Sequence, residues 1–190
     1  MEDSFSKNLF ITKKLEGNNG YAYTLASRLG EMLNMAEEMF GKRDRNYTIL
    51  GIEFYDGNPQ IWYPGDCKHI VIQLNRKALS SENEAYFELA QEVIHLLSPV
   101  QGKDVTLLEE GLAVVFTEHY LKKYFPKNTL QIKEQKYIEA KILVEKINLE
   151  IIKKLRSKIS TFSDIKKEEL ICENIDSDLA KKLLMKFNTV

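Results

Sequence analysis

The stretch from Glu88 to Leu97 constrains this 190-residue chain most, because its polar and apolar residues separate at helical spacing. At about 100° per residue, its polar side chains fall within an arc of about 100°, and its apolar side chains cover the opposite side. The polar set is Glu88, Gln91, Glu92 and His95, and the apolar set is Leu89, Ala90, Val93, Ile94, Leu96 and Leu97. The pattern predicts a helix that buries one side and presents a carboxylate and an imidazole on the other.

Capping signals predict where this helix begins and ends. Residues 81–84 read Ser-Glu-Asn-Glu, a capping box that starts the helix at about Glu82 and gives Glu84 a structural role. The pair Ser98-Pro99 ends it, because the residue before a proline disfavours the helical region.

A second helix is predicted a short way on. Residues 106–109 read Thr-Leu-Leu-Glu and repeat the capping-box spacing, so Glu109 is interpreted as a cap. Glu110 has no such explanation, and the segment from Gly111 to Phe116 is apolar nearly all round, as in a buried helix. A carboxylate there must be paired, bound to a metal or protonated.

The rest of the chain predicts an α+β fold in one domain, residues 1–190. We expect a loose polar arm over 1–20, a core of the domain over 21–125 and a helical C-terminal part over 126–190. Three short β-favouring runs before the central helix predict a small, mostly antiparallel three-stranded sheet, with the strands in antiparallel succession. The predicted strands are 47–55, 60–63 and 69–74, and the other predicted helices are 21–40, ending at Gly41, then 133–156, 165–173 and 179–187.

Two aromatic residues, Trp62 and Tyr63, stand in the middle strand. We favour a sheet face that packs on the helices, and the alternative is one wall of a binding groove.

Composition excludes some classes of partner. Lys plus Arg (27) nearly balance Asp plus Glu (28), so no overall charge favours nucleic acid or an anionic membrane. No signal sequence and no apolar run long enough to cross a membrane is visible. Cys67 and Cys172 match no metal or redox spacing, which indicates reduced thiols in a cytoplasmic protein.

The central helix carries most of a known catalytic pattern. Hydrolytic zinc sites commonly use His-Glu-x-x-His, in which two histidines one turn apart bind the ion and the glutamate takes a proton from metal-bound water. Residues 91–95 read Gln-Glu-Val-Ile-His, so the glutamate and the second histidine are present and the first histidine is a glutamine. A di-iron site could also use Glu92-x-x-His95, but no second copy of that pattern is visible.

With the Glu-Glu-Gly-Leu-Ala run at 109–113, the chain resembles the gluzincin (thermolysin-like) zinc metallopeptidases. That family takes its third ligand from a glutamate on the next helix, and it places a small sheet before the motif helix. The resemblance covers about residues 45–125. It implies that Glu92 is the counterpart of the general base and that His95 and Glu110 are counterparts of metal ligands, with Gln91 at the changed position. It also implies a strand beside the cleft that binds extended peptide by edge pairing.

The changed position decides what activity to expect. A neutral amide oxygen from Gln91 is a poorer zinc ligand than imidazole, so the cofactor is expected to be absent or a weakly bound zinc. His69, Glu88 and Cys67 could be recruited, whereas His119 faces away from Glu110 on its helix. Without metal, we expect His95 to bond directly to Glu110 or to Gln91, and Glu92 to be a solvated side chain.

Three functional hypotheses follow. The favoured one is a metallopeptidase-like protein with an incomplete zinc site, catalytically inactive, that keeps its cleft for a peptide or protein ligand or serves as a scaffold. The second is an active zinc-dependent peptidase that uses Gln91 or a recruited residue as ligand. The third is a plain interaction domain whose resemblance is accidental.

Overall fold

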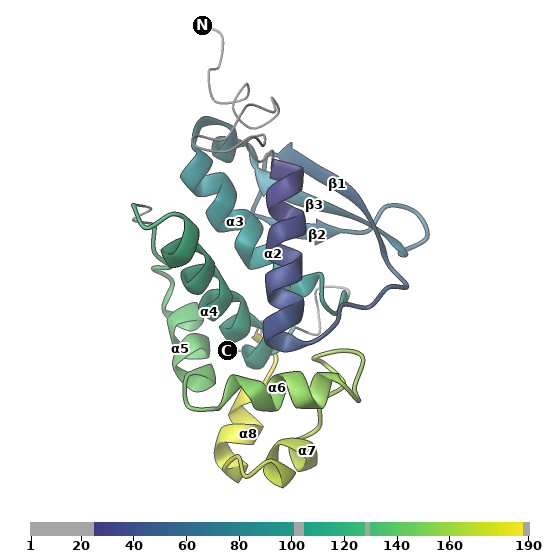
Figure 1. Ribbon diagram of the computed structural model, residues 1–190, viewed down its shortest axis with the longest axis vertical. Coiled ribbons are helices and arrows are strands. Elements are labelled where there is room, and N and C mark those ends of the chain that lie inside the picture. Colours follow the sequence, from purple (N-terminus) through teal and green to yellow (C-terminus); the bar gives the residue numbers. More distant parts are fainter. Residues whose placement is uncertain (1–24, 101–104, 128–129, 188–190) are drawn as a thin grey trace, which may run out of the picture.

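Seven α-helices and one small sheet make up the part of the chain described by this computed structural model, residues 25–100, 105–127 and 130–187 (Figure 1). The elements are α2 (Leu25–Phe40), β1 (Thr48–Tyr55), β2 (Gln60–Trp62), β3 (His69–Asn75), the 3-10 helix η1 (Arg76–Ser80), α3 (Glu82–His95), α4 (Leu107–Tyr124), α5 (Gln135–Val144), α6 (Leu149–Arg156), α7 (Lys167–Cys172) and α8 (Ser177–Leu183). The predicted α+β class is therefore confirmed. The arm predicted over 1–20 and the first residues of the predicted helix 21–40 lie outside the described ranges.

The three strands form a mixed sheet in the order β1-β3-β2. β2 and β3 are antiparallel, as predicted, but β1 and β3 are parallel, so the expected antiparallel succession is wrong for that pair. Each strand reverses direction relative to the one before it, yet β3 takes the middle place because it is the most apolar of the three. Its residues Ile70, Ile72 and Leu74 are fully buried, whereas the ends of β2 are exposed.

The caps of the two central helices agree with the sequence prediction. The Ser81 hydroxyl accepts a hydrogen bond from the Glu84 amide at 3.2 Å, and the Thr106 hydroxyl accepts one from the Glu109 amide at 3.3 Å. The amide of Ser81 donates to the carbonyl of Ala78 (3.2 Å). The serine cap is therefore confirmed, while the acceptor for its amide is a backbone carbonyl and not Glu84.

The helical C-terminal part is more broken than predicted. The single helix expected over 133–156 is two helices, α5 and α6, separated by a turn in which Asn148 caps α6 by accepting from the amide of Glu150 (3.0 Å). The helices predicted over 165–173 and 179–187 are the shorter α7 and α8. Asp176 caps α8 by accepting from the amides of Asp178 and Leu179. The Ser163-Asp164 pair, which the sequence favours as the cap of the helix over 165–173, does not cap α7, whose N-cap is Lys166.

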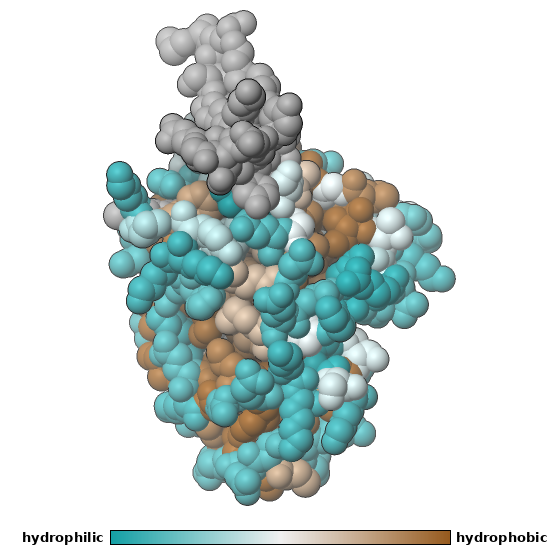
Figure 2. All heavy atoms as spheres, in the orientation of Figure 1, coloured by the Kyte–Doolittle hydropathy of each residue, from teal (hydrophilic) through white to brown (hydrophobic). Residues whose placement is uncertain are grey.

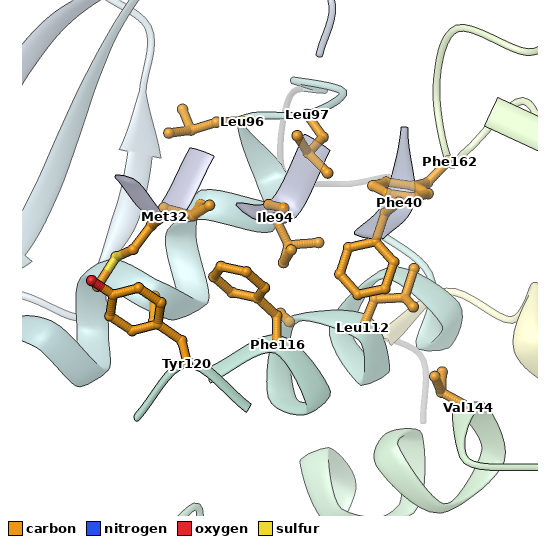
Figure 3. Close-up of a cluster of buried hydrophobic side chains, with 14 of the residues drawn as sticks. Met32, Phe40, Ile94, Leu96, Leu97, Leu112, Phe116, Tyr120, Val144 and Phe162 are labelled. Carbon is orange, nitrogen blue, oxygen red and sulfur yellow. The ribbon is translucent and has the colours of Figure 1, made fainter. Parts of the chain in front are cut away.

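One apolar core joins the N-terminal and C-terminal parts. Figure 3 shows side chains from α2, α3, α4, α5 and the loop after α6 converging in one cluster. The labelled members are Met32, Phe40, Ile94, Leu96, Leu97, Leu112, Phe116, Tyr120, Val144 and Phe162. Outside this core, the face seen in Figure 2 is mostly hydrophilic, with apolar residues gathered beside the strands at the upper right and among the helices below.

Two links tie the C-terminal part to the central helices. The buried guanidinium of Arg156 on α6 donates to the carbonyls of Lys42 and Leu97, each at 2.9 Å, just beyond the ends of α2 and α3. Gly41 ends α2 at a φ of +101°, as predicted from its cap position, and a Cβ added there would lie 2.8 Å from Cβ of Arg156.

The second link is a short antiparallel bridge between Thr106 and Lys186. The Leu107 amide donates to the carbonyl of Met185 and the Phe187 amide donates to the carbonyl of Val105, both at 2.9 Å. This C-terminal segment, residues 185–187, therefore braces the start of α4. No helix in the described ranges is long and apolar enough to span a membrane.

Candidate functional site

A cleft of about 640 Å³ lies between the β2 edge of the sheet and helices α3, α4 and α5. Strand β2 and its flanking residues 59 and 63 form one wall. The other lining residues are Cys67, Val100 and Val105 from loops, Gln91, Glu92 and His95 from α3, Glu109 and Glu110 from α4, and Tyr137 from α5. Polar residues of the two central helices thus face an edge strand across one cavity.

All four predicted site residues, Gln91, Glu92, His95 and Glu110, line this cleft. The polar face of α3 and the start of α4 are brought together because the apolar sides of both helices are buried in the core. Glu92 is only 8% exposed, so the expectation of a solvated Glu92 is wrong.

Of the residues proposed as recruited ligands, only Cys67 lines the cleft. His69 pairs with Asp66 at 2.9 Å, and the Glu88 carboxylate accepts from the amide of Asn75 at 2.8 Å. His119 is exposed, in agreement with its predicted orientation. Cys67 and Cys172 form no disulfide.

The partner of His95 is a residue that sequence reasoning assigned elsewhere. Nδ1 of His95 lies 2.8 Å from Oε1 of Glu109, whereas Nε2 of His95 lies 3.8 Å from Oε1 of Glu110. The prediction of a direct hydrogen bond to Glu110 or Gln91 is therefore wrong. The ring of His95 stands between the two adjacent glutamates at the start of α4.

Glu109 was missed because the capping box explained it. Its backbone amide is capped by Thr106 as predicted, but its side chain is 1% exposed and turns toward His95. A signal was present in the sequence: an all-apolar helix cannot leave a carboxylate unpaired, and this rule applied to Glu109 as much as to Glu110.

Burial and the neighbouring charges shift the pKa values of the site residues. Burial alone would lower the pKa of His95, but the carboxylates of Glu110 and Glu109 outweigh it and raise that pKa to about 10. Burial raises the pKa of Glu92 to about 7, with His95 opposing the rise and Glu110 and Glu88 adding to it. Burial also raises the pKa of Glu110. At neutral pH, His95 is an imidazolium held between two glutamates, and Glu92 titrates near neutrality.

Aromatic residues form much of the remaining wall. Trp62 and Tyr63 both line the cleft, as the groove-wall interpretation predicts, and Trp62 is 44% exposed. Tyr63 also packs against the core, as the favoured interpretation predicts. Tyr137, which sequence reasoning did not single out, is held by Phe187 of the C-terminal segment, with ring centroids 4.7 Å apart. The strand beside the cleft is β2, since β3 is paired on both sides.

The side chains of the cleft offer a zinc ion only part of a ligand set. An ion with bonds of about 2.0–2.2 Å could reach both Nε2 of His95 and Oε1 of Glu110 across their 3.8 Å separation. Across the described ranges, however, no three His, Cys, Asp or Glu side chains are grouped so as to hold a metal. Gln91 adds only a neutral amide, so these residues do not fit a tightly bound zinc ion.

Comparisons of the chain with protein-family models, curated proteins and solved structures find no match.

Proposed function

We propose that this chain is a gluzincin-like protein whose cleft binds an extended segment of a peptide or protein and does not hydrolyse it. The observation that carries the proposal is the place of β2. Within the described residues, β2 has a strand neighbour on one side only, and all of its residues line the cleft. An extended segment along that edge would extend the sheet through main-chain hydrogen bonds.

The size of the cleft suits a short segment. Three residues of β2 span about 10 Å at about 3.3 Å per residue, which matches an extended segment of about three to five residues. The half-exposed indole of Trp62 offers a large, rigid surface for a side chain of that segment.

The lack of hydrolysis is argued from residue chemistry. In the resembling family, the counterpart of Glu92 takes a proton from water that a zinc ion has activated. Here the donor set is one ligand short, and His95 is engaged by Glu109 on one ring nitrogen and faces Glu110 with the other. These features support a binding cleft over a catalytic one.

A binding experiment tests the proposal. Trp62 is the single tryptophan of the chain and lines the cleft, so its fluorescence reports on the cleft directly. Random octapeptide pools made without tryptophan should change this fluorescence, and bound peptide should slow amide hydrogen exchange in β2 and leave β1 unchanged. Pools with N-methylated backbones, which cannot pair with an edge strand, are the matched control and should not bind.

Two measurements decide against the alternative. Mass spectrometry should recover the octapeptides uncut, and elemental analysis should show far less than one zinc per chain. About one zinc per chain together with cut peptides would overturn the proposal in favour of a working zinc peptidase. Intact peptides with no fluorescence change and no protection of β2 would overturn peptide binding.

A further inference from the structure

The helix side of the cleft, where α3 meets the start of α4, has more carboxyl groups than basic groups. Three glutamates, Glu92, Glu109 and Glu110, line it together with one basic side chain, His95. No lysine or arginine belongs to the lining among the described residues. Even with His95 protonated, the carboxylates outnumber the cation.

Each of these carboxylates has unused hydrogen-bonding capacity. Glu92 is 8% exposed, and no described residue donates a hydrogen bond to its side chain. The Glu110 side chain is 13% exposed and meets His95 only at 3.8 Å, and Oε2 of Glu109 is buried with no hydrogen-bond partner within the described ranges. Because buried polar groups in native proteins are nearly always satisfied, an unpartnered carboxylate that lines a cleft points to a donor supplied by a ligand.

The neighbouring groups suit a ligand with N–H donors. The amide oxygen of Gln91 is a poor metal ligand but a good hydrogen-bond acceptor. Tyr137 lines the cleft with Glu110, and its pKa is raised by burial first and by that carboxylate second. Trp62 and Tyr63 add further aromatic faces to the lining. Carboxylates beside aromatic rings are the surroundings in which an organic cation binds well.

We propose that the helix side of the cleft binds one ammonium group of the bound segment, hydrogen-bonded to the carboxylates of Glu92 and Glu110 and to the amide oxygen of Gln91. This inference rests on the proposed function, because the ammonium belongs to the segment paired with β2. The group is either the N-terminal amine of the segment or a lysine side chain. Its three N–H donors match the three acceptors, whereas a planar guanidinium favours one carboxylate approached side-on.

Three octapeptide pools test the inference, all made without tryptophan, arginine or histidine. The first has a free N-terminus and no lysine, the second an acetylated N-terminus and one lysine, and the third an acetylated N-terminus with norleucine in place of that lysine. Trp62 fluorescence gives the affinity of each pool. The free-amine pool, the lysine pool or both should bind about 10- to 100-fold tighter than the neutral pool, and the comparison of the two identifies the source of the ammonium.

Matched variants locate the effect. Glu92→Gln should remove the preference for the cationic pools, and it removes a buried charge, so the variant is expected to fold. Glu82→Gln changes an exposed glutamate at the other end of α3 and should keep the full preference. Glu110→Gln should weaken the preference as well.

The two proposals fail in different ways. If the neutral pool binds as tightly as the cationic pools, peptide binding stands and the ammonium site is overturned. A cationic preference that survives in both Glu92→Gln and Glu110→Gln overturns the assigned residues. If no pool binds, both proposals fall together.

Discussion

A substitution at Gly111 tests how closely α4 and α5 pack beside the cleft. It lies on α4 directly after Glu110, and a Cβ at this position would meet the backbone of Ala140 and Cγ2 of Val144, the latter at 2.5 Å. Both obstructing residues belong to α5, so the missing side chain lets α5 approach α4 closely. We therefore predict that Gly111→Ala forces the two helices apart and destabilises the fold.

The magnitude follows from a comparison with Gly30 on α2, where an added Cβ meets nothing within 4 Å. Each Gly→Ala change gains about 1 kcal/mol of helix propensity. Overpacking costs about 1–3 kcal/mol, and we take about 3 kcal/mol because backbone atoms cannot rotate away. Gly30→Ala should thus stabilise by about 1 kcal/mol, and Gly111→Ala should destabilise by about 2 kcal/mol.

Urea unfolding followed by circular dichroism measures the free energy of unfolding of both variants, and thermal unfolding measures their melting temperatures. For a chain of this length, a gap of about 3 kcal/mol corresponds to a difference in melting temperature of about 6–12 °C between the variants. The movement of α5 should also shift Tyr137, so Gly111→Ala should alter the fluorescence of Trp62 in the folded state while Gly30→Ala leaves it unchanged. If Gly111→Ala proves as stable as Gly30→Ala, the close approach of α4 and α5 described here is refuted.

Three further predictions concern buried polar groups. The pKa of Glu92 is raised from 4.5 to about 7, so the folded protein favours the protonated carboxyl. The resulting stability is complete below about pH 4.5 and is lost as the pH rises to 7. At about 1.4 kcal/mol per pKa unit, the loss is about 3 kcal/mol. In Glu92→Gln, the urea midpoint should change less with pH over that range. An unchanged dependence of the midpoint on pH would refute the burial of the Glu92 charge. Gln91→His should bind about one zinc per chain, measured by elemental analysis, because Glu109 already orients His95 as carboxylates orient metal-bound histidines; retention of that zinc after Glu110→Gln would contradict the geometry. Arg156→Met should lower the free energy of unfolding by about 3 kcal/mol, because two backbone carbonyls lose their buried donor, and a change below about 0.5 kcal/mol in urea unfolding would show that they are satisfied in another way.

Local chemistry explains which parts of the fold the sequence predicted. Ser81 and Thr106 cap helices as expected, because a cap depends on residues only two or three positions away. The apolar faces of α2, α3 and α4 were visible for the same reason. The order of the strands was not, because β3 reaches the middle of the sheet through pairing between residues about 20 positions apart. The division of α5 from α6 was hidden by apolar residues that continue at helical spacing through the turn before Asn148.

The candidate site likewise has residues that local sequence patterns predicted and residues that they did not. Helix periodicity placed Gln91, Glu92 and His95 on one face, and the structure has all three in the cleft. The choice between Glu109 and Glu110 as partner of His95 depends on how α3 and α4 cross, which no pattern within either helix encodes. Tyr137 was missed for a related reason, since it reaches the cleft through the packing of α5 on α4 and the support of Phe187.

The bridge between residues 105–107 and 185–187 has a consequence for the order of assembly during synthesis. The sheet, α3 and α4 are all translated before α5 begins, but the core that they share also contains Val144 and Phe162 from later in the chain. The start of α4, which carries Glu109 and Glu110, gains its brace only after Phe187 has emerged. The apolar core and the cleft are thus both complete only after the C-terminal helices have been made.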